Sequence, residues 1–97
     1  MKKDLEFYEE LESRFEDINK EMLHMYIDKN RRYSNSFAET IREYGMIVTS
    51  MRLDEKLKRL KSINKYGEDK DGDSLEDTLI DIANYCIISL MEVRANK

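Results

Sequence analysis

Apolar side chains recur at steps of three and four residues along most of the chain, which is the spacing of one face of an α-helix. The first such stretch predicts a helix over about residues 4–30, with acidic side chains on its outer faces. Its apolar seam consists of Tyr8, Leu11, Phe15, Ile18, Met22 and Met25.

A short second helix is expected after this seam. Residues 30–35 break the apolar spacing, and Ser34 or Asn35 is a favourable residue type for a helix N-cap. The helix would run through Glu43, with Gly45 as its terminator.

Two more helices complete the prediction. The third fits residues 46–65, with Leu53, Leu57 and Leu60 on one side, and residues 66–73 form a loop with two glycines. Ser74 or Asp73 is placed to cap the last helix. The chain is therefore predicted to be all-α, a four-helix, mostly antiparallel bundle with one short helix, and residues 1–97 to form a single domain.

The last helix has two apolar walls. One wall is Leu75, Leu79, Ile82, Cys86, Leu90 and Val93, and the other is Ile80, Ala83, Ile87 and Met91. A surface helix needs one apolar face, so this helix is expected to be buried on two sides. One bundle supplies one side, and a second subunit would supply the other, which predicts a homo-oligomer.

Composition and charge narrow the class of protein. The single cysteine, Cys86, allows no disulfide framework, and the start of the chain has no apolar leader, so a cytoplasmic protein is expected. The net charge of −4 is uneven: residues 29–66 carry a balance of +6 between two acidic ends. The acidic total makes duplex DNA and membranes unfavourable partners. The basic centre favours an anion site or mutual attraction of helices.

A polar strip runs along the apolar last helix. It consists of Asp77, Asp81 and Asn84, and uncompensated polar groups at such positions cost free energy. One side of the third helix carries charged residues that could pair with this strip. The loop after the first helix carries basic residues around a tyrosine. These side chains form either a structural ion-pair network or a phosphate clamp with a stacking aromatic. They are Arg52, Glu55, Lys56 and Arg59 on the third helix, and Lys29, Arg31 and Arg32 around Tyr33.

Taken together, three segments resemble one family. They are Lys29-Asn30 with Tyr33 and Ser36-Phe37; Arg52 with Glu55-Lys56 and Arg59-Leu60; and residues 73–79 continuing to Asp81 and Ala83-Asn84-Tyr85. The family is the nucleotide modification associated domain, first type, found in phages and bacteria. The family often has glycine after the tyrosine, where this chain has Ser34. The family is also similar in helical layout to the MazG-like nucleotide pyrophosphatases.

The resemblance implies a nucleotide ligand, and a bacterial host cytoplasm if the protein is phage-encoded. We expect binding without turnover and without a cofactor, as in sequestration of a phosphorylated or cyclic nucleotide signal for anti-defence. The expected ligand-binding residues are Lys29, Tyr33, Ser36, Arg52, Lys56, Arg59, Asp81 and Asn84. One alternative is a Mg²⁺-dependent pyrophosphatase with Glu55, Asp77 and Asp81 as metal ligands. A second is a structural or partner-binding helical module; no catalytic residue is assigned.

Overall fold

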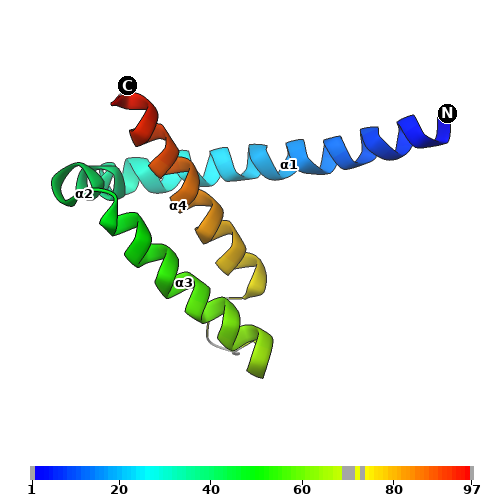
Figure 1. Cartoon of the computed structure of the whole chain (residues 1–97). Helices are drawn as coiled ribbons and strands as arrows, with labels where there is room; N and C mark the ends of the chain where they lie inside the picture. Colours follow the sequence, from blue (N-terminus) through cyan, green and yellow to red (C-terminus); the bar gives the residue numbers. More distant parts are fainter. Residues whose placement is uncertain (1, 69–71, 73, 97) are drawn as a thin grey trace. The chain divides into compact units, whose positions relative to one another are not determined.

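The computed structural model describes residues 2–68, 72 and 74–96, and within them it contains α-helices and no strands. The helices are α1 (Lys2–Arg32), α2 (Ser36–Tyr44), α3 (Ile47–Tyr66) and α4 (Leu75–Ala95), in the order shown in Figure 1. The prediction of an all-α chain with four helices, one of them short, is confirmed. No helix among the described residues is long and apolar enough to cross a membrane.

The chain divides into two compact units, residues 1–34 and residues 35–97. The assignment of residues 1–97 to a single domain stays a prediction. The first unit consists of the 31-residue helix α1 and the turn that follows it. Met22 is the buried residue of α1 and Met25 is half-buried, whereas the other members of the apolar seam are exposed, as Phe15 is at 70%. The apolar residues of the seam therefore lie along one side of α1, as predicted, but most of them are not buried in a core.

The second unit begins with α2, whose cap differs from the expectation. Ser34 and Asn35 both adopt left-handed backbone conformations, with φ of 55° and 60°. Asn35 occupies the N-cap position, yet its side chain makes no capping hydrogen bond, because a left-handed cap residue turns the side chain away from the usual geometry. Gly45 ends the helix as predicted, with φ of 87° and its N–H donating to the Ile41 carbonyl.

Helix α4 begins with a complete capping box. The Asp77 N–H donates to Ser74 Oγ at 3.0 Å, and the Ser74 N–H reaches Asp77 Oδ2 at 3.5 Å. This satisfies two of the donors that a helix start leaves without intrahelical partners. Ser74 is therefore the cap, and the alternative, Asp73, lies outside the described residues.

Within the second unit, α3 and α4 run side by side in opposite directions, and α2 packs against both (Figure 1). The buried hydrophobic side chains here are small or medium in size: Ala38, Ile41 and Val48. Helix α4 contributes Thr78, Ser89 and Glu92 to the interior instead of leucines. Together with Asp81 and Tyr85, which are half-buried, they form a polar face of α4 that points inward.

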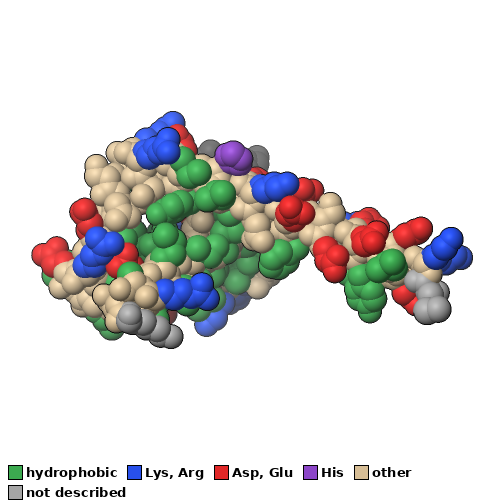
Figure 2. Space-filling view, turned by 90° about the horizontal axis from the view of Figure 1, so that it is seen from above, with side chains coloured by type: hydrophobic (Ala, Val, Ile, Leu, Met, Phe, Trp, Pro, Cys, Tyr) green, Lys and Arg blue, Asp and Glu red, His purple; other side chains and the backbone are tan. Residues whose placement is uncertain are grey.

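The apolar walls of α4 are consequently turned outward, which corrects the expectation that the unit would bury one of them. Hydrophobic side chains remain visible on the surface in the space-filling view (Figure 2). Ile80, Ile82 and Ala83 are half-buried, and the other seven residues of the two walls are exposed: Leu75, Leu79, Cys86, Ile87, Leu90, Met91 and Val93. The sequence pattern identified the walls correctly but assigned the wrong side of the helix to the interior.

The inward polar face is stabilised by contacts from the two neighbouring helices. Arg42 of α2 donates two hydrogen bonds to the buried carboxylate of Glu92. Its Nε lies 2.9 Å from Oε2, and its Nη2 lies 3.0 Å from Oε1. The hydroxyls of Thr49 and Ser89 hydrogen-bond at 2.7 Å across α3 and α4. No buried side-chain N or O among the described residues lacks a partner, so burial of these polar groups is compensated.

The Arg42–Glu92 contact predicts how stability depends on pH. The hydrogen bond from Arg42 holds the pKa of Glu92 below its ordinary value of 4.5 in the folded protein. The stabilisation is therefore fully present above pH 4.5 and is lost as the pH falls through the lower, folded pKa. Glu92→Gln should lower the melting temperature near neutral pH, and its difference from the parent should shrink as the solution is acidified below pH 4.5.

Thermal unfolding followed by circular dichroism between neutral pH and about pH 3 tests this dependence. Glu16→Gln is a matched control, because Glu16 pairs with Lys20 on the exposed surface of α1 at 3.5 Å, and exposed pairs contribute little. A Glu92→Gln difference that stays constant across the whole range would contradict the role given to the ion pair.

Candidate functional site

An ion pair between α3 and α4 joins two residues that the sequence singled out. Lys56 Nζ lies 2.9 Å from Asp81 Oδ2, and the two side chains are only 20% and 26% exposed. Their positions follow from the helix period, because both lie on the sides of α3 and α4 that face each other. Lys56 and Asp81 thus form an ion pair, as in the structural alternative, and this pair neutralises a carboxylate within the inward polar face. Their role in ligand binding stays a prediction.

Arg52 and Arg59 lie on one flank of α3, two turns apart, and both are exposed. Glu55 shares this flank and lies 3.6 Å from the Arg52 guanidinium. An exposed pair at that distance contributes little free energy. We call Arg52 and Arg59 the arginine flank; it presents guanidinium groups where an anion could reach them.

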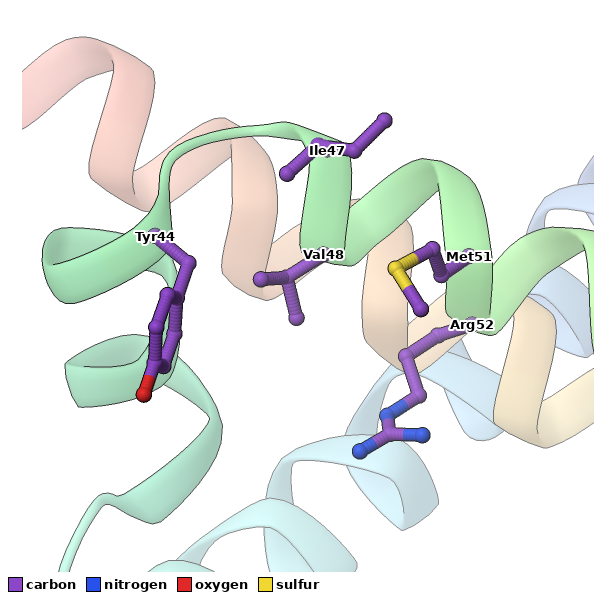
Figure 3. A pocket seen from close by; sticks show the side chains of 5 residues that line it. All are labelled: Tyr44, Ile47, Val48, Met51 and Arg52. Carbon is purple, nitrogen blue, oxygen red and sulfur yellow. The ribbon is translucent and has the colours of Figure 1, made fainter.

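A pocket of about 300 Å³ opens beside Arg52, at the junction of α2 and α3. It is lined by Tyr44, Ile47, Val48, Met51 and Arg52. In Figure 3 the ring of Tyr44 and the guanidinium of Arg52 stand on opposite sides of the opening, with Val48 between them. The pocket combines an apolar lining, an aromatic ring and one permanent positive charge.

The other residues of this unit that the sequence singled out make contacts away from the pocket lining. Ser36 is the first residue of α2, and its carbonyl accepts a hydrogen bond from the Thr40 hydroxyl at 2.8 Å. The ring of Phe37, the next residue, packs on Tyr85 of α4 with 4.8 Å between centroids. Asn84 is half-buried on α4.

Lys29 and Tyr33 belong to the first unit. Lys29 is in the last turn of α1, and its carbonyl accepts a hydrogen bond from the Tyr33 N–H at 3.0 Å. The Tyr33 side chain is exposed, so its ring is available to a planar ligand. That Lys29 and Tyr33 share one site with the arginine flank stays a prediction.

The three carboxylates considered as metal ligands each have another contact. Glu55 is near Arg52, Asp77 completes the capping box of α4, and Asp81 pairs with Lys56. In the part of the chain that the structure describes, no group of three or more His, Cys, Asp or Glu residues could hold a metal ion. These carboxylates therefore show no fit to a Mg²⁺ site within the described residues.

Sequence reasoning missed the pocket and the Arg42–Glu92 pair. Tyr44, Ile47 and Met51 line the pocket because α2 ends and α3 begins at one corner, which residue spacing within either helix does not reveal. Glu92 was detectable in principle, since it continues the steps of three and four from Thr78 through Asp81, Tyr85 and Ser89. A charged residue in register with a polar stripe indicates a partner inside the fold.

A comparison with known protein families covers the three segments that the sequence singled out. The family model described as nucleotide modification associated domain 1 matches residues 29–93. Searches of curated proteins and of solved structures returned no significant match. The matched range takes in α2, α3 and most of α4, including the Phe37–Tyr85 and Lys56–Asp81 contacts. The chain therefore belongs to the nucleotide modification associated domain 1 family.

Proposed function

We propose that the second unit binds a phosphorylated nucleotide at the arginine flank of α3, with the base in the adjoining pocket. The observation that carries this proposal is the position of Arg52, whose guanidinium lines the same pocket of about 300 Å³ as the ring of Tyr44. A phosphate on Arg52 would leave the attached nucleoside next to an aromatic ring and apolar side chains.

The chemistry of these groups suits the two halves of a nucleotide. A guanidinium fork matches phosphate oxygens with two parallel hydrogen bonds, and an aromatic ring stacks on any base. A pocket of about 300 Å³ is at the lower end of the range for small-molecule sites. The weak Arg52–Glu55 contact at 3.6 Å can yield to a phosphate at little cost.

Binding without turnover is the better-supported form of this function. Hydrolysis of a nucleotide by Mg²⁺ needs several carboxylate oxygens gathered around the phosphate. Asp77 and Asp81 are engaged by the helix cap and by Lys56. Asp81 and Asn84 would then serve as hydrogen-bonding groups for sugar or base edges, with Ser36 as a further contact of the same unit.

The family supports a nucleotide as the ligand, since its description associates the domain with nucleotide modification. We further propose, from the resemblance, that the protein is phage-encoded and sequesters a phosphorylated or cyclic nucleotide signal in the host cytoplasm. The protein would remove the signal by holding it, and its capacity would equal the number of pockets.

Arg52→Ala should weaken nucleotide binding by ~1.5–3 kcal/mol, the range for a hydrogen bond to a charged group. The fold should be retained, because Arg52 is exposed and its contact with Glu55 is weak. Calorimetric titration of the parent and the variant with nucleoside triphosphates and cyclic dinucleotides measures the change. Lys58→Ala is the matched control: Lys58 is on the same helix, exposed, and pairs with Asp54. Unchanged affinity together with a lower melting temperature would assign Arg52 a structural role.

Asp81→Asn separates binding from hydrolysis. For a binding site, the parent should return each nucleotide unchanged after denaturation, with or without Mg²⁺, and the variant should bind more weakly. Phosphate or pyrophosphate release by the parent in Mg²⁺ or Mn²⁺ that disappears in Asp81→Asn would instead favour the pyrophosphatase alternative. Chromatography of the incubated nucleotides, before and after denaturation, distinguishes the two. No depletion of any nucleotide would favour a structural or partner-binding module.

A further inference from the structure

An exposed apolar face of α4 takes no part in the proposed nucleotide binding. Its stripe consists of Leu79, Ile82, Cys86, Leu90 and Val93, and we call it the α4 stripe. Leu79 is 49% exposed, Leu90 48% and Val93 41%. Contiguous large apolar side chains on a surface are unfavourable in water and mark a contact site.

We propose that a second copy of this chain covers the α4 stripe, with the two α4 helices antiparallel about a twofold axis that passes near Cys86. Such a contact is isologous, since the same surface of both copies meets itself. At 21 residues α4 is about 31 Å long, so it offers a complementary surface of matching length to its own copy.

The spacing of the stripe indicates that α4 itself is the occupant. Leu79 and Ile82 lie seven and four residues before Cys86, and Leu90 and Val93 lie four and seven residues after it. The stripe is therefore symmetric about Cys86. Antiparallel pairing about that point places Leu79 opposite Val93 of the second copy and Ile82 opposite Leu90. Every large side chain of the stripe then meets another large apolar one.

Charge also favours a second copy of α4. A twofold contact brings two copies of the same patch together, so a patch with charges of one sign would repel its copy. Between residues 78 and 91 the single charged residue is Asp81, which lies on the inward face and pairs with Lys56. Small side chains at Ala83 and Cys86 allow close approach of the two helices at the centre.

The second unit buries little apolar surface of its own, which is why a partner on the α4 stripe would stabilise it. Its buried hydrophobic residues are Ala38, Ile41 and Val48, which form a small core for residues 35–97. Small domains with little buried apolar surface depend on additional association. Pairing of the α4 stripes would add leucine, isoleucine and valine side chains to the buried apolar surface, which is small in the isolated unit.

The first test uses the parent chain and its single cysteine. Light scattering at low micromolar concentration should give twice the mass of one chain. A short bismaleimide should join the two chains through Cys86, since a twofold axis beside it brings both thiols together. Cys86→Ser should abolish the cross-link and keep the dimer. A monomeric parent overturns the proposal, and so does a dimer in which Cys86 does not cross-link.

The second test fixes the direction of the pairing. Leu79→Glu should dissociate the dimer, and adding Val93→Lys to the same chain should restore it, because the two new charges lie opposite each other only in the antiparallel arrangement. Tyr66→Glu, at an exposed apolar residue of α3, is the control and should leave the mass unchanged. A Leu79→Glu variant that remains dimeric would contradict the antiparallel contact. A folded double variant that remains monomeric would contradict it as well. Neither test involves a nucleotide, so its outcome is independent of the proposed function.

Discussion

The arrangement of the second unit depends on the inward polar face of α4. Thr78, Asp81, Ser89 and Glu92 point toward α2 and α3, and each has a partner there or in its own helix. Burial of unpaired groups of this kind would cost several kcal/mol, so Arg42, Lys56 and Thr49 must be where they are for the helices to pack. Directional hydrogen bonds therefore specify how α2, α3 and α4 meet, while hydrophobic burial within the unit is modest.

This constraint also explains where the apolar residues of α4 are found. A helix whose polar face is satisfied inside the fold has to expose its apolar walls, since the two lie on different sides of one cylinder. Leu79, Leu90 and Val93 are exposed for this reason. The dimer proposed above follows from the same geometry, because it supplies the apolar contact that the inward face does not make.

The site and the polar interior share α3. Its inward side carries Lys56 and Thr49 toward α4, and the neighbouring flank carries Arg52 and Arg59 toward solvent. An ion pair and a hydrogen bond join the first set to α4, so α3 is held in the fold on one side and presents its arginines on the other. The pocket forms where α2 turns into α3 at Gly45, whose φ of 87° suits a residue without a side chain. The Lys56–Asp81 and Thr49–Ser89 contacts therefore join α3 to α4, and Arg52 is the charged residue that lines the pocket.

The sequence by itself determined the helices, because apolar spacing, Gly45 and the Ser74–Asp77 capping box are local signals that act within one or two turns. It also identified the two apolar walls of α4 and the pairing candidates Lys56 and Asp81, but it missed Thr78, Ser89 and Glu92 of the inward polar face. Which face of α4 points inward was decided only by the tertiary structure. It depends on Arg42 of α2 and Lys56 of α3, which neutralise Glu92 and Asp81. The pocket at Tyr44 and Arg52 was likewise invisible in the sequence, since it is made by the angle between two helices and not by the period of either.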